Sequence, residues 1–202
     1  MDQVLGNIEK FEISYKEKNL EYFVIDKLVS SEELIWIYHE LIEKESWSLS
    51  RTSTEINRGL IPFVGFPGLI IEDKGSIIEP YLSGWFKSLV FRISSLLKKE
   101  YNFKLPSNIR RIHIGAKSSL SRTEKHIDSE NQDDWTILGF LNPIWNNKDG
   151  GEFKLNNTFI EYISGRFIVF PSWIPHDGGY IKNEKLNYWR ISSNIILSEK
   201  IT

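Results

Sequence analysis

The strongest constraint on the fold is a change of hydrophobic period about halfway along the 202-residue chain. Up to about residue 108 the sequence predicts two amphipathic helices. The first follows Ser30, which has the spacing of a capping box with Glu33, and its apolar residues recur every three or four positions. The second is predicted from about Ile77 to Glu100, with Pro80 in its first turn. Its apolar stripe consists of Tyr81, Leu82, Trp85, Phe86, Leu89, Ile93, Leu96 and Leu97.

From Ile109 onward the pattern changes to short apolar segments separated by turn signals such as Asn142-Pro143 and Ser164-Gly165. The predicted strands are Ile109–Ile114, Lys125–Asp128, Trp135–Leu141, Glu152–Leu155, Phe159–Ile163, Arg166–Phe170, Ile174–His176 and Tyr188–Leu197. Such strands after two helices favour an α+β, mainly β fold. We expect a double-stranded β-helix (a jelly-roll or cupin-like core) with the N-terminal helices packed on one sheet.

The organisation predicted is a single domain. Residues 1–108 form its helical support region, with a strand at Tyr22–Ile25, and about 109–198 form the jelly roll. Residues 48–73 contain several Gly and Pro with scattered aromatics, which indicates loops and short strands, and two interpretations of the segment stay open, a surface connection and a lid. Residues 115–124 are predicted to form a loop at the rim of the core.

Composition excludes several classes of protein. The formal net charge of −2 and the pI of about 6.1 do not suggest a polyanion partner, so nucleic-acid binding is not expected. Cysteine is absent, which rules out disulfides and thiolate metal sites, and only four His are present. The sequence shows neither a signal peptide nor an apolar run long enough for a bilayer, so we expect a cytoplasmic protein without a membrane partner.

The candidate metal ligands are His126, Asp128 and His176. On a strand, residues i and i+2 share a face, so His126 and Asp128 can reach one ion. His176 would complete the two-histidine, one-carboxylate set that leaves positions open on a non-haem Fe(II). A chance His-x-Asp pair arises in roughly one such chain in six, and a hydrogen-bonded structural role is the alternative for a lone His. Arg190 is placed to hold a carboxylate beside the metal.

Other chemistries find less support. The sequence contains no Gly-x-Ser-x-Gly elbow and no glycine-rich phosphate loop of the Walker or Rossmann type. Asp177 cannot share an ion with its neighbour His176 on a strand, because adjacent side chains face opposite ways.

Taken in order and spacing, several elements resemble those of the Fe(II)/2-oxoglutarate-dependent dioxygenases, and among these the prolyl 4-hydroxylase-like branch. Residues 22–30, a strand leading into a helix, are similar to the opening of that branch. The matching elements in the C-terminal half are His126–Asp128, Leu138–Asn142, Gly150–Phe153, Gly165–Pro171, His176 and Arg190–Ser192.

The resemblance implies that His126, Asp128 and His176 bind Fe(II). It also implies that 2-oxoglutarate chelates the iron and places its far carboxylate on Arg190, with the Ser192 hydroxyl as a second donor. O2 would take the remaining position. The reaction implied is hydroxylation of a substrate C–H bond with release of succinate and CO2.

The sequence departs from the family where a Tyr often reaches 2-oxoglutarate. The best-matching positions are His113 and Phe140, and Phe140 has no hydroxyl. His113 has two open interpretations, a donor to 2-oxoglutarate and a structural strand residue. For the aromatics near the motifs, core packing and a role in the pocket wall are both open: Trp135, Phe140, Trp145 and Trp173.

Three functions follow as alternatives. The first is hydroxylation of a residue in a protein or peptide, proline being favoured by the resemblance. The second is the same chemistry on a free small molecule, an amino acid or a nucleotide. The third is a non-catalytic jelly-roll binding module, which the complete ligand set with Arg190 argues against. Four arginines have two open interpretations, a second clamp on a metabolite and a solvated surface charge: Arg51, Arg58, Arg111 and Arg122. The oligomeric state is not specified by the sequence.

Overall fold

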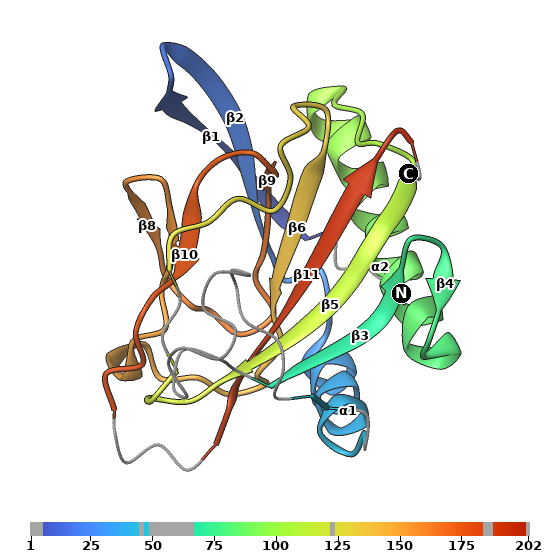
Figure 1. Cartoon of the computed structure of the whole chain (residues 1–202), viewed down its shortest axis with the longest axis vertical. Coiled ribbons are helices and arrows are strands. Elements are labelled where there is room, and N and C mark those ends of the chain that lie inside the picture. Colours follow the sequence, from blue (N-terminus) through green and yellow to red (C-terminus); the bar gives the residue numbers. More distant parts are fainter. Residues whose placement is uncertain (1–5, 45–46, 49–66, 122–123, 184–187, 201–202) are drawn as a thin grey trace.

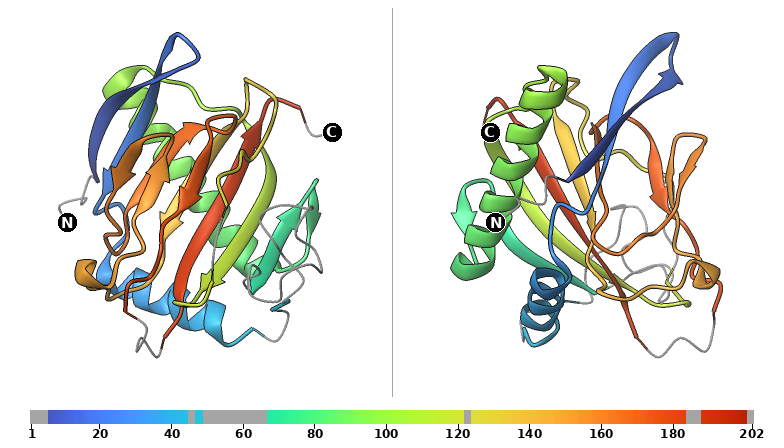
Figure 2. Two further views of the ribbon diagram at one scale, coloured as in Figure 1. Left: turned by 60° about the vertical axis from the view of Figure 1, so that its left-hand side comes forward. Right: turned by 180° about the vertical axis from the view of Figure 1, so that it is seen from behind.

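The computed structural model describes residues 6–44, 47–48, 67–121, 124–183 and 188–200. Within this part of the chain the elements form three layers, with the helices on one side of a large sheet and a small sheet on the other (Figures 1 and 2). The described strands of the large sheet are, in spatial order, β1 (Asn7–Tyr15), β2 (Lys18–Asp26), β9 (Phe167–Pro171), β6 (Trp135–Phe140), β11 (Arg190–Ser198), β5 (Asn108–Lys117), β3 (Gly68–Asp73) and β4 (Ser76–Ile77). The described small sheet contains β10 (His176–Gly178), β7 (Phe153–Leu155) and β8 (Thr158–Ile160), and a short 3-10 helix, η2, covers Asn147–Asp149.

The two α-helices are tied to each other by a partly buried polar contact. Helix α1 (Ser31–Ile42) begins where the Ser30 hydroxyl accepts a hydrogen bond of 3.1 Å from the Glu33 N–H, as the capping spacing predicts. The Glu33 carboxylate accepts hydrogen bonds from Arg92 at 2.6 Å and from the Trp85 indole at 2.8 Å. Both donors lie on helix α2 (Pro80–Tyr101). Glu33, in the first turn of α1, therefore links the two helices.

The large sheet separates two hydrophobic cores, because alternate residues of each strand face opposite ways. Towards the helices, Phe23 and Val169 pack with the apolar face of α2. Towards the small sheet, Val24 and Ile168 pack with Phe153 and its neighbours on β7. The second of these cores, between the large and the small sheet, fills one end of the space between the sheets. The candidate site lies in the same space.

The predicted mainly β fold with helices on one sheet is confirmed. The first hundred residues also contribute β1 to β4, and of these β1 and β4 were not predicted. The sequence of β1 has a mostly exposed, charged face, which weakens its apolar signal. Strand β3 lies in the segment predicted as a loop or lid, whose residues 49–66 are outside the described residues, as are Arg51, Arg58 and Arg122.

Three local predictions are wrong. Tyr81 was placed in the apolar stripe of α2, but it is 64% exposed and contacts Trp36 edge to face at 5.5 Å, because its ring lies in the first turn beside α1. Residues 115–117 belong to β5 and not to a rim loop, since their backbone pairs with β11. The predicted strand 125–128 is a single antiparallel bridge between His126 and His176. Neither described α-helix is long and apolar enough to cross a bilayer.

Candidate active site

His126, Asp128 and His176 lie together although His176 is 48 positions beyond Asp128 in the chain. One ligand-type atom from each residue lies within 4.8 Å of the others. This spacing suits three atoms that each approach one ion at about 2 Å. The side chain of Asp128 is 3% exposed and that of His176 is 4% exposed, so both are shielded from bulk water.

Backbone pairing brings the three residues together. The N–H of His126 donates to the carbonyl of His176 at 2.9 Å, and the N–H of His176 donates to that of His126 at 2.8 Å. This exchange places the two rings on the same face, with centroids 4.6 Å apart. The Asp128 N–H then donates to the Ser172 carbonyl at 2.9 Å, so the same short stretch of chain presents the carboxylate beside both rings.

Each imidazole is held in one tautomer. The Nδ1 of His126 is 2.9 Å from the Glu124 carbonyl, and the Nδ1 of His176 is 2.9 Å from the Ile174 carbonyl. A carbonyl oxygen can only accept, so both Nδ1 atoms carry the hydrogen and the Nε2 atoms present lone pairs. Burial, together with the nearby His176, lowers the pKa of His126 and favours its neutral form. Neutral rings with a free Nε2 are the state that a metal requires.

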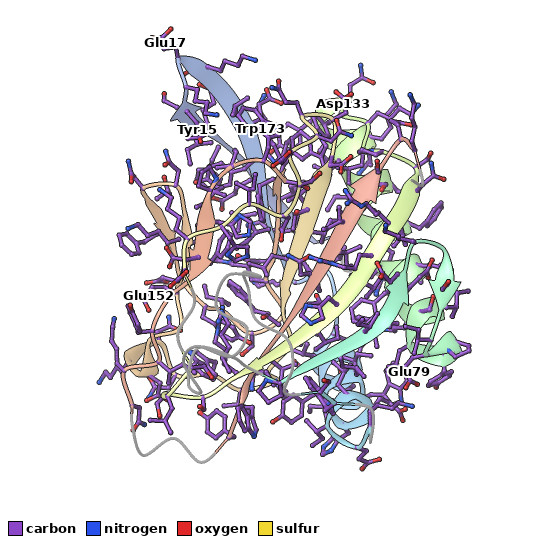
Figure 3. The ribbon with its side chains drawn as sticks, viewed as in Figure 1. Tyr15, Glu17, Glu79, Asp133, Glu152 and Trp173 are labelled. Atoms are coloured by element: carbon purple, nitrogen blue, oxygen red, sulfur yellow. The ribbon has the colours of Figure 1, made fainter. Side chains whose placement is uncertain are left out.

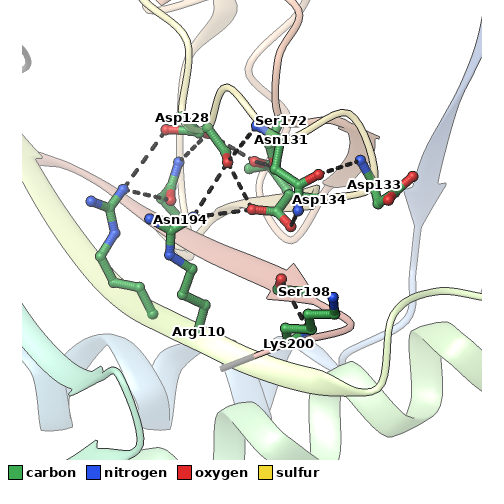
Figure 4. A network of polar contacts seen from close by, with 12 residues as sticks. Arg110, Asp128, Asn131, Asp133, Asp134, Ser172, Asn194, Ser198 and Lys200 are labelled. Atoms are coloured by element: carbon green, nitrogen blue, oxygen red, sulfur yellow. Dashed lines mark hydrogen bonds and ion pairs between the residues drawn. The ribbon is translucent and has the colours of Figure 1, made fainter. Parts of the chain in front are cut away.

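The Asp128 carboxylate is fixed by side chains from β6 and β11. Its Oδ2 accepts hydrogen bonds from Thr136 at 2.8 Å and from the Asn194 amide at 2.9 Å (Figure 4). Arg111 lies 3.8 Å from Oδ1. Burial alone would raise the pKa of Asp128, but the two histidines, the Arg111 charge and the hydrogen bond from Asn194 outweigh it and lower the pKa. The carboxylate is therefore charged and oriented.

A second polar cluster fixes the loop that follows Asp128. The buried Asp134 carboxylate accepts from Ser129 at 2.7 Å, from Asn131 at 2.8 Å and from Arg110 at 3.1 Å (Figure 4). Ser129 is next to the candidate ligand, so this cluster limits movement of the segment that presents Asp128.

Arg190 lies at the opposite end of the same interior space. It opens β11 and is 1% exposed, with its guanidinium 5.0 Å from the Tyr162 ring and 5.8 Å from the Phe140 ring. Its Nε and Nη1 atoms are buried without a hydrogen-bond partner among the described residues. Burial lowers the pKa of Arg190, while Tyr162 and Glu152 act in the other direction. A buried cation with unused donors is costly, and an anion would relieve that cost.

The strand register aligns the other predicted residues with Arg190. On β11, Arg190, Ser192 and Asn194 alternate and share the face that reaches Asp128. Ser192 is opposite Phe140 on β6, and His113 is opposite Asn194 on β5. The inner face thus brings together every residue that the sequence suggested for the cosubstrate.

Lys117 and Tyr162 were missed from the sequence. Lys117 is opposite Arg190 on β5 and is 8% exposed. Tyr162 stacks on Phe140 at 4.2 Å, and its buried hydroxyl donates to the Ile191 carbonyl, so it supports the wall behind Arg190. Knowing that β5 pairs with β11 would have identified Lys117, because paired residues share a face. No motif marks Tyr162.

The aromatic residues of interest have different roles. Trp135 packs towards the helices, 4.8 Å from the Phe103 ring, and Trp145 packs on Tyr162 at 4.7 Å. Trp173 instead lines a surface pocket of about 320 Å³ near the tip of the β1–β2 hairpin (Figure 3). The pocket is lined by Tyr15, Lys16, Lys18, Ile127, Glu130, Gln132 and Trp173. Ile127 lies between two candidate ligands in the sequence, so the pocket borders the ligand segment, on the side away from the His126 and Asp128 side chains.

No protein-family model and no curated protein matches the sequence. Similarity appears in three dimensions. A prolyl-4-hydroxylase from Pseudomonas putida is 11% identical with a TM-score of 0.63, over 87% of this chain and 91% of that chain. A 2OG-Fe(II) oxygenase family oxidoreductase from Burkholderia pseudomallei is 15% identical with a TM-score of 0.65, over 89% and 86%.

A third solved structure is a prolyl hydroxylase from Trichoplax adhaerens in complex with a peptide fragment of the hypoxia inducible factor oxygen degradation domain. It is 22% identical with a TM-score of 0.60, over 89% of this chain and 84% of that chain. The chain therefore has the fold of the 2OG-Fe(II) oxygenases, prolyl hydroxylases among them, which confirms the predicted resemblance at the level of the fold.

Proposed function

We propose that the protein is an Fe(II)- and 2-oxoglutarate-dependent dioxygenase that hydroxylates a C–H bond of a protein or peptide residue, in the manner of a prolyl 4-hydroxylase. The observation that carries this proposal is the convergence of His126, Asp128 and His176 with both Nε2 atoms available. Two imidazoles and one carboxylate are the donor set of non-haem Fe(II) oxygenases. When bound, Fe(II) and 2-oxoglutarate supply O2 activation, with succinate and CO2 as products.

The side chains of the protein have separate tasks in this proposal. His126 and His176 bind the metal as neutral ligands, and Asp128 contributes the negative charge that Thr136 and Asn194 orient. At the other end of the site, Arg190 holds the far carboxylate of 2-oxoglutarate, since its planar fork suits a carboxylate. Ser192 and His113 are on the same face as further donors. Both ends exclude water, which strengthens each charge interaction.

The proposed unit is the whole single domain. Residues 109–198 supply the candidate ligands and the Arg190 end, and residues 1–108 support them from the helix side and add the β1–β2 hairpin beside the pocket. A peptide substrate is favoured by this open pocket, which has aromatic and charged walls and borders the ligand segment. It is also favoured by the peptide bound in the Trichoplax protein of the same fold.

The test of function is release of succinate by purified protein supplied with Fe(II), 2-oxoglutarate and air. We expect slow release without a prime substrate and faster release with a substrate peptide, which should gain the mass of one oxygen atom. Asp128→Ala serves as the inactive control. If succinate does not exceed a metal-free control, the proposed activity is wrong. If only free metabolites gain oxygen, the chemistry stands and the peptide assignment fails.

A further inference from the structure

We propose that Lys117 is the second cation of the cosubstrate site, so that its ammonium and the Arg190 guanidinium together hold the far carboxylate of 2-oxoglutarate and select a dicarboxylate. This inference rests on the proposed function and assigns a role to a residue that the sequence motifs do not mark.

The strand register places the two cations side by side. Lys117 is directly opposite Arg190 in the antiparallel pair of β5 and β11. Directly opposed residues share a face and lie close together, and like charges in that arrangement are destabilising. The shared face is that of Ser192 and Asn194, which leads to Asp128. The fold therefore tolerates an electrostatic cost on the wall of the candidate site.

Gly178 shows that both cations extend towards one point. A Cβ at Gly178 would lie 2.6 Å from the Lys117 Nζ and 3.1 Å from the Arg190 Nη1. Gly178 belongs to β10, two residues after His176, which corresponds to about 7 Å of strand. A five-carbon dicarboxylate can bridge such a length. Because Gly178 has no side chain, the Lys117 Nζ and the Arg190 guanidinium can both approach the β10 backbone at this point.

The local charge balance favours an anion at this point. Lys117 is 8% exposed and Arg190 is 1% exposed, and two donor atoms of Arg190 have no hydrogen-bond partner among the described residues. Burial and the Arg190 charge lower the pKa of Lys117, and Asp177 only partly offsets this. The Glu152 carboxylate is engaged by Lys182 at 2.9 Å through Oε1 alone, and its buried Oε2 has no hydrogen-bond partner among the described residues. A carboxylate beside the two side chains would accept from the unused Arg190 donors and offset the desolvation cost of that guanidinium.

The test is calorimetric binding with Mn(II) in place of Fe(II), so that no turnover occurs. Two ligands are compared, 2-oxoglutarate and 2-oxopentanoate, which keeps the chain length and lacks the far carboxylate. For Lys117→Met we expect the Kd of 2-oxoglutarate to rise on the order of tenfold, with the Kd of 2-oxopentanoate and of Mn(II) unchanged. Lys154→Met is the matched control, because Lys154 is on the outward face of β7 between two buried residues.

A second variant tests the same point without removing a charge. Gly178→Ala is expected to weaken 2-oxoglutarate several-fold and spare 2-oxopentanoate, because the methyl group enters the space next to the Lys117 Nζ. Unchanged 2-oxoglutarate affinity in Lys117→Met, or an equal loss for both ligands, would overturn the assignment while the proposed function stands. If the unmodified protein binds no 2-oxoglutarate at all, the proposed function itself fails.

Discussion

The two ends of the candidate site differ in how their charges are satisfied. At the metal end, the Asp128 carboxylate accepts two hydrogen bonds, and both histidine rings are anchored to backbone carbonyls. At the Arg190 end, two buried cations face each other, and Arg190 retains unused donors. The polar groups of the first end are hydrogen-bonded within the protein, whereas at the second end two buried donors of Arg190 have no partner among the described residues.

Because of this difference, we expect protein stability and ligand binding to be coupled differently at the two ends. Removing a partner at the metal end leaves a buried group unsatisfied and weakens binding of the metal. Removing a cation at the Arg190 end relieves an electrostatic cost in the free protein and still weakens binding of the carboxylate. The comparison is therefore testable by measuring stability and affinity on the same variants.

The largest effect is expected for His176→Ala. The substitution removes the His176 Nε2, one of the three candidate metal ligands. Binding of one Mn(II) or Fe(II) per chain should therefore fall below detection in equilibrium dialysis. His39→Ala, on the exposed side of α1, should bind the metal like the unmodified protein. Retained stoichiometric binding in His176→Ala would break the assignment of the metal end.

Arg190→Met should separate protein stability from 2-oxoglutarate affinity at the Arg190 end. Loss of the buried cation should weaken 2-oxoglutarate by about 3 kcal/mol, more than a hundredfold. The ligand-free variant should be as stable as the unmodified protein or more stable, by about 1–4 kcal/mol, since Met fills the volume without a desolvation cost. Denaturant unfolding and calorimetry measure both. A strongly destabilised variant would show that Arg190 is structural.

Asn194→Ala should sharpen the description of the metal end. It removes one of two donors to the Asp128 carboxylate, so metal affinity should fall about tenfold, as for other groups that orient a ligand. Asn108→Ala, at a half-buried position at the start of the neighbouring strand β5 and with its side chain bonded to the Glu199 carbonyl, is the control. An effect on 2-oxoglutarate alone would contradict the role assigned to Asn194.

The smallest effect is expected outside both ends, at Trp173. Trp173→Ala removes an aromatic wall of the surface pocket and its contact with Tyr15, at 5.6 Å. The KM for a peptide substrate should rise several-fold, while succinate release without substrate stays constant. Phe91→Ala, which removes a 72% exposed aromatic from α2, should change neither value. Equal loss of both activities would place Trp173 in the support of the site.

The sequence predicted the residues of the site better than their surroundings. The structure groups His126, Asp128 and His176, as their side-chain chemistry and spacing predicted, and their role as metal ligands, like that of Arg190, stays a prediction. The i and i+2 argument gave the correct shared side for His126 and Asp128, although the segment forms one bridge and not a strand. The arrangement holds because His176 pairs with His126 through the backbone.

Lys117 shows where sequence reasoning stopped. A lysine at the end of a strand cannot be told from a loop lysine by the local sequence. Its role depends on its pairing with Arg190, which is 73 positions away. Register between distant strands is set by packing of the whole sheet and not by local pattern. For the same reason Tyr162 and the Thr136 and Asn194 donors became identifiable only once the sheets were placed.

The most direct test of the central claim is a crystal structure with Mn(II) and 2-oxoglutarate, with the metal located from its anomalous scattering. We predict one metal bound by the Nε2 atoms of His126 and His176 and by the Asp128 carboxylate, with the far carboxylate of 2-oxoglutarate at Arg190. A metal located elsewhere, or 2-oxoglutarate bound away from Arg190, would contradict it.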